Sequence, residues 1–224
     1  MIERIVPASV AAEEAFEHAD DALLYPEEEA LLVRVVPKRR REFTTARQCA
    51  RAALARLGVP PAPILPGQRG APAWPPGVVG SMTHCAGYVA AALAHERDIV
   101  TIGVDAEPHE PLPDGVLRMV SLESERPMLG QLAADAPDVC WDRLLFCAKE
   151  AVYKAWFPLA RKWLDFSGAR ITFASNSALF ADGTFEAQLL VPGPFVAGRE
   201  VTGFSGRWLV ADGFMLTAIT VPTA

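Results

Sequence analysis

The sequence predicts an α+β protein made of two similar halves, each with one long helix and a small antiparallel sheet. Apolar residues recur at steps of three and four in residues 37–57 and again in 141–157, which is the spacing of an amphipathic helix. Short strand-like segments accompany each helix. Residues 108–139, rich in Pro, Asp, Glu and Ser, separate the two sets. We therefore expect an N-terminal half over 1–108 and a C-terminal half over 109–224.

The first helix is expected from Pro37 to Leu57. Proline fits a first helical turn, and Gly58 stands where a C-terminal cap belongs. Its buried face is predicted to carry Phe43, Ala46, Ala50, Ala53 and Leu57. Arg40, Arg47 and Arg51 fall on another stripe of the same helix, which in a generic helix is a solvated face.

Residues 60–80 form a connector rich in proline and glycine. We expect it to be irregular but ordered, because it carries Ile64, Leu65 and Trp74 to bury. Residues 89–94 and 99–105 are predicted strands with a short turn between them, so we expect them to pair antiparallel. Pro108 is expected to end the second of these strands.

The C-terminal half is predicted to hold a short helix near 128–132 and a long helix from Trp141 to Phe157, ended by Pro158. The rest is rich in strand-like sequence, at residues 171–173, 185–191 and 207–221. Asp182-Gly183 and Asp212-Gly213 each stand between apolar segments, which predicts two hairpins.

The composition excludes several classes of protein. Half of the 224 residues are hydrophobic, enough for a sizeable core, yet no apolar run approaches the roughly 18 residues of a membrane span. Residues 1–4 lack the layout of a signal peptide. The four cysteines show no C-x-x-C spacing, so we expect free thiols in the cytoplasm rather than disulfides or a zinc site.

The charge is unevenly distributed along the chain. The net charge of −6 argues against general nucleic-acid binding. Eight of the 21 basic residues nevertheless lie between Arg34 and Arg56. Of the 27 acidic residues of the chain, only Glu42 lies in this segment. An acidic protein with one concentrated basic segment indicates a local site for a polyanion.

Two short segments carry acidic residues in arrangements that suit catalysis. Asp105 and Glu107 alternate along a strand, so they are expected on one face, about 7 Å apart at Cα. Carboxylates that close repel each other, and one is pushed toward protonation unless a cation lies between them. Glu150 and Lys154 are expected to stack one helical turn apart. Singly, each pattern is common on protein surfaces; together they suit a magnesium-bound phosphate ester or anhydride if the fold unites them.

Three blocks of sequence have the residues and the order of the motifs of one known family. They are Gly80-Ser81-Met82-Thr83-His84, then Ile102 to Pro108, then Trp141 to Trp156 with Phe146-Cys147-Ala148-Lys149-Glu150-Ala151 inside it. On these blocks the chain resembles the 4′-phosphopantetheinyl transferase family, in the bacterial branch of enterobactin-associated and mycobacterial broad-specificity enzymes. The resemblance extends from the basic helix through Phe166 and, more weakly, to the C-terminal strands.

This resemblance implies a fold and a reaction. The two α+β halves would be related by a pseudo-twofold axis, with coenzyme A in the cleft between them. The enzyme would transfer the 4′-phosphopantetheine arm of coenzyme A to a serine of apo acyl or peptidyl carrier proteins and release adenosine 3′,5′-bisphosphate. The carriers would belong to polyketide, non-ribosomal peptide, siderophore or fatty-acid synthases, and the enzyme would be a monomer.

The resemblance also assigns roles to residues. Asp105, Glu107 and Glu150 would hold Mg²⁺, and Glu150 would also act as general base on the carrier serine, directly or through water. Lys154 would stabilise the leaving group, and Lys149 would contact phosphate. The remaining expected contacts to coenzyme A are His84, Arg39, Arg47 and Arg69, of which Arg69 would replace a lysine that relatives carry where this chain has Pro66. Candidates for carrier docking are Arg118, Met119, Arg126 and Arg161-Lys162-Trp163.

Two other functions remain open on the sequence alone. A non-catalytic module would bind coenzyme A without turnover. A metal-dependent phosphodiesterase would release the bisphosphate without any acceptor protein.

Overall fold

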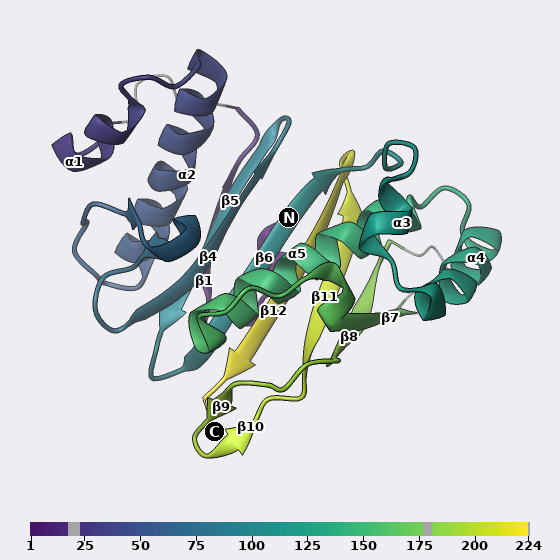
Figure 1. Cartoon of the computed structure of the whole chain (residues 1–224). Helices are drawn as coiled ribbons and strands as arrows, with labels where there is room; N and C mark the ends of the chain where they lie inside the picture. Colours follow the sequence, from purple (N-terminus) through teal and green to yellow (C-terminus); the bar gives the residue numbers. More distant parts are fainter. Residues whose placement is uncertain (18–22, 177–180, 224) are drawn as a thin grey trace.

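The protein, as a computed structural model, is described over residues 1–17, 23–176 and 181–223. Two antiparallel sheets dominate it, a three-stranded sheet of order β1-β5-β4 and a five-stranded sheet of order β6-β12-β11-β8-β7 (Figure 1). The strands of the first sheet are β1 (Ala11–Ala15), β4 (Val78–Cys85) and β5 (Tyr88–His95). Those of the second are β6 (Ile99–Pro108), β7 (Ala169–Ser175), β8 (Asp182–Leu189), β11 (Gly203–Ala211) and β12 (Phe214–Pro222).

Helices cover these sheets. They are α1 (Pro26–Glu29), α2 (Pro37–Arg56), α3 (Val116–Val120), α4 (Arg126–Asp135) and α5 (Trp141–Ala160), with short 3-10 turns η1 (Ile2–Arg4), η2 (Ala30–Leu32), η3 (Gln68–Gly70), η4 (Glu123–Glu125) and η5 (Phe166–Gly168). Two small hairpins complete the fold, β2 (Leu65–Pro66) with β3 (Pro72–Ala73), and β9 (Phe195–Val196) with β10 (Arg199–Glu200). The predicted α+β class is confirmed.

The first predicted helix is confirmed as α2. Pro37 occupies its first turn, and Gly58 follows its end with a left-handed φ of 70°. The buried face packs on one side of the three-stranded sheet, where Ala50, Ala53 and Leu54 contact Val89 and Leu93 of β5 in one apolar cluster. The connector behaves as predicted: Ile64 is buried, and the indole of Trp74 donates to Gly80 O at 3.0 Å.

Helix α5 is longer than predicted. Pro158 lies inside it, and the helix ends instead at Arg161, whose left-handed φ of 54° caps the last turn. Because proline is so near the end, it removes one intrahelical hydrogen bond without interrupting the remaining turn. One face of α5 packs on the five-stranded sheet, with Leu145, Val152 and Trp156 in the largest apolar cluster.

The predicted pairing of residues 89–94 with 99–105 is wrong. Strand β5 pairs with β1 and β4, whereas β6 pairs with β12, more than one hundred residues later in the chain. Both faces of β5 are covered, one by α2 and the other by the second sheet, so its apolar run did not require β6 as a partner. By hydrogen bonding, β6 belongs to the C-terminal sheet; the division of the halves at residue 108 stays a prediction.

One of the two predicted hairpin turns is confirmed. Asp212 and Gly213, both with positive φ, connect β11 to β12 in a two-residue turn. Asp182 and Gly183 lie instead in β8, paired with β7 and β11. The connection from β7 to β8 runs through residues 177–180, outside the described residues.

The two sheets meet at β4 and β6, which lie side by side and run in the same direction. No backbone hydrogen bond joins these two strands, both of which are fully described. Two hydroxyls bridge them: Ser81 Oγ accepts from Val104 N, and Thr83 Oγ1 accepts from Ala106 N, each at 3.1 Å. The even-numbered residues of β6 and β5 form a shared apolar layer behind this junction.

Gly103 lets α5 approach β6 closely. A Cβ at this position would collide with the carbonyl of Ala151 and lie 2.7 Å from the amide nitrogen of Ala155. We expect Gly103→Ala to lower the free energy of unfolding by about 3 kcal/mol, because helix backbone rather than a flexible side chain would have to move. Chemical denaturation measures this difference.

Gly130→Ala is the matched control for that variant. Gly130 lies on the exposed side of α4, with open space where a Cβ would be. Alanine there should stabilise the protein by about 1 kcal/mol through helix propensity alone. Equal behaviour of the two alanine variants would contradict the close approach of α5 and β6.

Candidate active site between the two halves

One face of β6 points at α5. Thr101 Oγ1 donates to Ala155 O at 2.9 Å, Asp105 binds Lys154, and Glu107 binds Arg143 through an Nη1–Oε2 distance of 2.9 Å. Asp105 and Glu107 therefore share a face, as strand alternation predicts. The carboxylate strand and the helix that carries Glu150 and Lys154 come together, so the fold unites the two segments.

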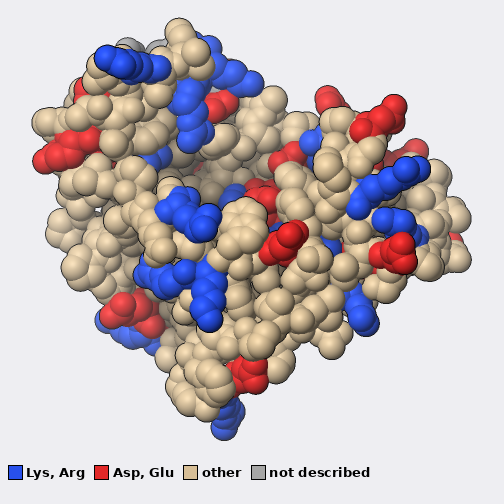
Figure 2. Space-filling model, in the orientation of Figure 1, with Lys and Arg blue, Asp and Glu red and all other residues tan. Residues whose placement is uncertain are grey.

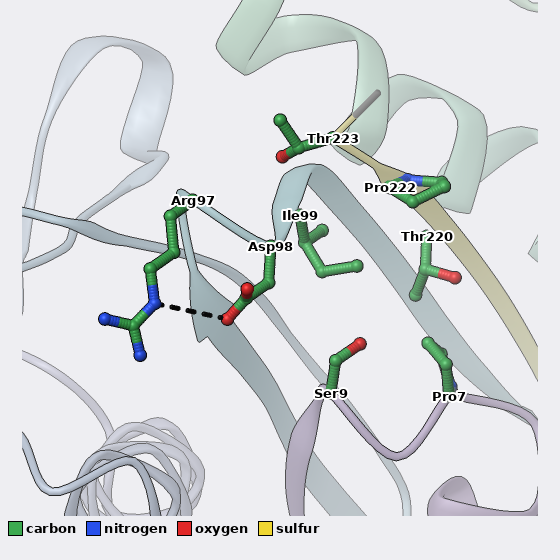
Figure 3. A pocket seen from close by; sticks show the side chains of 8 residues that line it. All are labelled: Pro7, Ser9, Arg97, Asp98, Ile99, Thr220, Pro222 and Thr223. Carbon is green, nitrogen blue, oxygen red and sulfur yellow. Dashed lines mark ion pairs between the residues drawn. The ribbon is translucent and has the colours of Figure 1, made fainter.

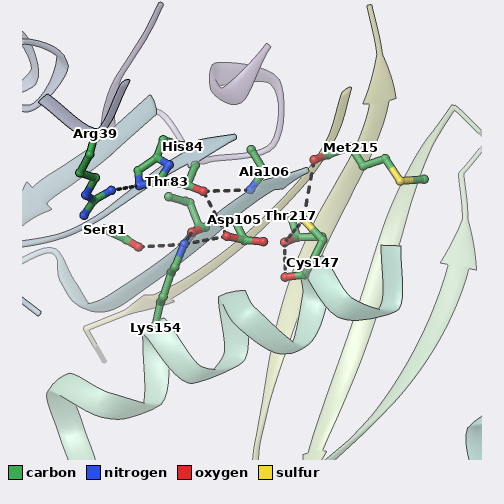
Figure 4. A network of polar contacts seen from close by, with 11 residues as sticks. Arg39, Ser81, Thr83, His84, Asp105, Ala106, Cys147, Lys154, Met215 and Thr217 are labelled. Carbon is green, nitrogen blue, oxygen red and sulfur yellow. Dashed lines mark hydrogen bonds and ion pairs between the residues drawn. The ribbon is translucent and has the colours of Figure 1, made fainter. Parts of the chain in front are cut away.

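The Asp105 carboxylate is held asymmetrically (Figure 4). Its Oδ1 accepts from Thr83 Oγ1 at 3.1 Å and from Lys154 Nζ at 2.7 Å. Lys154 also donates to Val104 O at 3.0 Å. The second oxygen, Oδ2, is buried and has no hydrogen-bond partner among the described residues, although Asp105 is only 5% exposed. A buried carboxylate oxygen left in this way is costly unless a cation or donor reaches it.

The negative charge of Asp105 affects the pKa values of Glu107 and Glu150. Burial raises the pKa of Glu107, and the negative charge of Asp105 raises it further, while Arg143 opposes both. Burial likewise raises the pKa of Glu150, again reinforced by Asp105 and opposed by Lys154. Glu150 forms no ion pair within the described part of the chain. The three carboxylates thus share one electrostatic environment.

The site is not a preformed metal centre. Across the described ranges, no three His, Cys, Asp or Glu side chains are arranged as a group that could hold a metal ion. Lys154 and Arg143 instead neutralise Asp105 and Glu107. Within the described residues, the oxygens of the three carboxylates that accept no hydrogen bond are Asp105 Oδ2, the second oxygen of Glu107 and the carboxylate of Glu150. These are hard oxygen donors, of the kind that suit a divalent cation such as Mg²⁺.

His84 links the carboxylates to the basic helix α2. Arg39 Nη1 lies 2.6 Å from His84 Nε2, and because a guanidinium can only donate, Nε2 is the acceptor and the ring is neutral. Burial lowers the pKa of His84, opposed by Glu42, which lies 3.9 Å from Nδ1. The charges of Arg39 and Lys154 lower this pKa further. The imidazole therefore stands between the arginine and the Asp105–Lys154 pair, as Figure 4 shows.

Arg47 is buried near the middle of the basic helix α2. It is 8% exposed, its guanidinium carbon lies 3.3 Å from the centre of the Phe43 ring, and its Nε donates to Ile64 O at 3.3 Å. Burial lowers its pKa to about 10, so the group stays charged at neutral pH. In the described residues its terminal nitrogens have no hydrogen-bond partner. They are available to an anion.

Other basic residues of the predicted stripe support the fold. Arg51 donates to both oxygens of the fully buried Glu28, at 3.0 and 2.9 Å, and Arg40 pairs with Glu29. Glu28 also accepts from Ile64 N, so it ties α1 and the connector to α2. The interpretation as a solvated face is wrong for Arg51, because its guanidinium forms an ion pair with the buried carboxylate of Glu28.

Arg69 lies apart from Arg39 and His84. It has a left-handed φ of 54°, and its guanidinium carbon lies 5.6 Å from the ring centre of Trp163, which follows α5. Trp163 in turn contacts Tyr153 at 4.9 Å between ring centres. Over the part of the chain that is described, no contact joins Arg69 to the other predicted phosphate ligands. Its contact with Trp163 joins the irregular segment 60–80 to the end of α5.

Lys149 does not point toward the carboxylates. Its Nζ is buried, 2.9 Å from Glu125 Oε2, and donates to Phe166 O and Ala169 O at 2.8 and 3.1 Å. The predicted phosphate contact of Lys149 therefore does not fit this structure. Lys149 lies at helical steps from Leu145 and Val152, on the apolar stripe, and that spacing is the signal that places it inside.

Sequence reasoning also missed Thr83 and Arg143. Arg143 precedes Glu150 by seven residues, so helical spacing places both on one face, where a partner for Glu107 was to be expected. Thr83 stands inside the first family block, two residues after Ser81 on the same side of a strand. The partners of the Ser81 and Thr83 hydroxyls could not be predicted without knowing which strand lies beside β4.

The rim of the site carries exposed apolar groups. Of the predicted docking residues, Met119 is 70% exposed and Trp163 is 60% exposed. Arg118 directly precedes Met119 in α3, Arg161 caps α5 two residues before Trp163, and Arg126 Nε donates to Ser121 Oγ at 3.3 Å. Figure 2 shows that this face is hollowed between the part of the molecule that carries α2 and the part that carries α3 and α4, with basic and acidic side chains inside.

Two concave pockets lie elsewhere and lack matching chemistry. The first, of about 440 Å³, is lined by Pro7, Ser9, Arg97, Asp98, Ile99, Thr220, Pro222 and Thr223 (Figure 3). Its charged groups are Arg97 and Asp98, an exposed pair that neutralise each other at 3.6 Å. The second lies over β8, β11 and β12 and includes Glu186 and Arg207. Neither contains the family blocks.

Two further findings concern the whole chain. No helix in the described ranges is long and apolar enough to cross a membrane. The cysteines at 49, 85, 140 and 147 are all free, and burial holds the pKa of the Cys147 thiol well above its usual value.

Comparison with known families and proteins gives consistent matches over most of the chain. Residues 27–94 match the 4′-phosphopantetheinyl transferase N-terminal domain, and residues 101–192 match the 4′-phosphopantetheinyl transferase superfamily. The chain is 56% identical to 4′-phosphopantetheinyl transferase Svp of Streptomyces mobaraensis over 224 residues, covering 99% of this chain and 89% of that protein.

Two more relatives match over nearly their whole length. The transferase Npt of Nocardia iowensis is 54% identical over 222 residues, which cover 98% of this chain and 99% of the relative. The transferase PptT of Mycobacterium tuberculosis is 46% identical over 225 residues, covering 99% and 98% respectively.

The buried Lys149–Glu125 pair generates a prediction about stability. Lys149→Met should lower the free energy of unfolding by about 3–5 kcal/mol, because Glu125 would remain as an uncompensated buried carboxylate. Urea denaturation of the variant measures the loss. The double variant Lys149→Met with Glu125→Gln should lose less than the sum of the two single losses. Strict additivity would show that the two groups do not interact.

Proposed function

Because the chain belongs to the 4′-phosphopantetheinyl transferase superfamily, its reaction is transfer of the phosphopantetheine arm of coenzyme A to a carrier protein, and we propose which of its residues perform that reaction. The observation that carries the proposal is the convergence at Asp105. Asp105 accepts hydrogen bonds from Thr83 of β4 and Lys154 of α5, keeps one buried oxygen without a partner among the described residues, and through its charge raises the pKa of Glu150. Coenzyme A would lie in the cleft between these elements.

In the transfer step, the serine oxygen of the carrier bonds to the phosphorus that bears pantetheine. The bond from that phosphorus to the bridging oxygen breaks, and adenosine 3′,5′-bisphosphate leaves. Glu150 would accept the serine proton, directly or through water. Lys154, already beside Asp105, would stabilise the negative charge that develops on the leaving oxygen.

The carboxylates suit a divalent cation. Asp105 Oδ2, Glu107 and Glu150 would hold Mg²⁺, and the orphaned buried oxygen of Asp105 is the feature that best fits such an ion. The bound ion would supply charge neutralisation at the pyrophosphate. Arg143 holds Glu107 in place from the outer side, so this carboxylate would keep its orientation with or without the metal.

Arg39, Arg47 and His84 would bind the phosphates of coenzyme A. Arg47 is buried yet charged and offers free terminal nitrogens, which suits the nucleotide 3′-phosphate. Arg39 and His84 bond each other at present, and a phosphate would replace that bond with contacts to each. Arg69 would act nearer the end of α5, beside Trp163, rather than at the 3′-phosphate.

The partner would be an apo carrier protein or carrier domain of a polyketide, non-ribosomal peptide, siderophore or fatty-acid synthase. Met119 and Trp163 are exposed apolar side chains, and the basic residues Arg118, Arg126, Arg161 and Lys162 lie near one or the other in the sequence. Such a rim suits the acidic helix that carrier proteins present around their serine. We further propose that the enzyme acts in the cytoplasm as a monomer.

Mass spectrometry tests the transfer directly. The protein, coenzyme A, Mg²⁺ and a panel of apo carriers should yield carriers heavier by one phosphopantetheine, whereas Asp105→Ala should leave them unmodified. Failure with every carrier would reject the transferase assignment. Release of adenosine 3′,5′-bisphosphate without any carrier would favour a phosphodiesterase.

Glu150→Gln should separate stability from activity. The folded-state pKa of Glu150 is raised, so the contribution of this residue to stability is fully present below its unfolded pKa and is lost as pH rises through its folded pKa. Glutamine mimics the protonated form, so without metal the variant should melt higher than wild type at pH 8, and this gain should vanish at acidic pH. Transfer should fall by about 100-fold or more. Thermal melting at both pH values and the mass assay provide the two measurements; no gain at pH 8 would contradict the electrostatic account.

Arg47→Ala should discriminate between two substrates. The KM for coenzyme A should rise about tenfold or more, because a charge-assisted contact to the 3′-phosphate is lost. The KM for 3′-dephospho-coenzyme A should change little. Lys38→Ala, another basic residue of α2 but an exposed one, is the control for a general loss of charge. Equal changes for both substrates would show that Arg47 does not contact the 3′-phosphate.

A further inference from the structure

Ser81 and Thr83 occupy equivalent places on β4. Both are buried, and each accepts a hydrogen bond from a backbone amide of β6, Ser81 from Val104 and Thr83 from Ala106, both at 3.1 Å. These bonds replace the backbone ladder that is missing between the two strands. In this respect the two hydroxyls do the same thing.

Thr83 has a second role that Ser81 lacks. A hydroxyl carries one proton, and with the Ala106 amide donating to its oxygen, Thr83 directs that proton to Oδ1 of Asp105, 3.1 Å away. The amide fixes the hydroxyl, and the hydroxyl in turn fixes the carboxylate. No contact of this kind is made by Ser81 among the described residues.

Lys154 donates to the same oxygen from the opposite half. With Nζ at 2.7 Å and the threonine hydroxyl at 3.1 Å, Oδ1 has two donors while Oδ2 has none. A carboxylate held by one oxygen alone can rotate about its χ2 angle, and a second donor from another direction opposes that rotation. The identity of the free oxygen is therefore set by the pair of donors.

We propose that Thr83 is a positioning residue: with Lys154 it occupies Oδ1 of Asp105 and so reserves Oδ2 for the divalent cation of the reaction. The inference rests on the proposed metal role of Asp105. Thr83 itself would touch neither the cation nor the pyrophosphate. It would act by limiting Asp105 to the orientation in which Oδ1 meets its two donors and the buried Oδ2 stays free.

Two variants that remove a hydroxyl separate positioning from simple support of the fold. Thr83→Val and Ser81→Ala each remove a hydroxyl that accepts a β6 amide, so both should lower the melting temperature of the protein. Only Thr83→Val also removes the donor to Asp105. Thr83→Ser keeps that donor and should restore the wild-type behaviour.

Metal binding is the deciding measurement. Calorimetric titration with Mn²⁺ in the presence of adenosine 3′,5′-bisphosphate, and the Mg²⁺ concentration that gives half-maximal transfer, should both be measured for the four proteins. We expect Thr83→Val to weaken Mn²⁺ binding and to raise the required Mg²⁺ about tenfold. Ser81→Ala and Thr83→Ser should stay within about twofold of wild type on both measures.

The outcomes distinguish this inference from the function beneath it. Wild-type metal affinity in Thr83→Val, or an equal loss in Ser81→Ala, would overturn the positioning role while leaving the transferase and its metal intact. Transfer by the wild type without any need for a divalent cation would overturn the metal assignment itself. If Thr83→Val does not fold, the same titrations on Thr83→Ala decide the matter in the same way.

Discussion

The ion pair between Lys154 and Asp105 connects helix α5 to β6, the strand at which the two sheets meet. On its other side, β6 contacts the N-terminal sheet through two hydroxyls, one of which binds the same carboxylate oxygen. The hydrogen bonds of Asp105 therefore depend on how β4 and α5 lie relative to each other. The rest of the site depends on this arrangement, because Glu107, Glu150 and His84 all owe part of their electrostatic environment to the charge of Asp105.

Concentrating three carboxylates at one place opposes folding, and the protein offsets that repulsion with cations of its own. Arg143 and Lys154 neutralise two of the acids, while Glu150 stays without an ion pair within the described residues. A protein optimised for stability alone would not keep a half-buried carboxylate in this state. On the basic side, Arg39 is bonded to neutral His84, which does not cancel its positive charge. The acidic side of the cleft thus suits a cation, and the basic side suits an anion.

The features that could be predicted from the sequence depend on local patterns. Apolar periodicity predicts α2 and α5, and strand alternation places Asp105 and Glu107 on one face. The pairing of β6 with β12 could not be predicted, because the two strands are far apart in sequence and the apolar run of β5 gives no sign of its partner. The buried Lys149 shows a related limit. A charged residue on an apolar stripe reaches inward only if a partner such as Glu125 waits there, and that partner lies in a different element.

The absent backbone ladder between β4 and β6 has a mechanical consequence. Strands joined by a full ladder resist sliding along their length, whereas a junction bridged by two side-chain hydroxyls is the compliant seam of the molecule. In contrast, α5 packs so closely on β6 that Gly103 has no room for a Cβ. We therefore expect any sliding of one sheet against the other to occur along the junction of β4 and β6, where Thr83 lies. Hydrogen exchange at the amides of Val104 and Ala106 is a direct gauge of how firmly that junction holds.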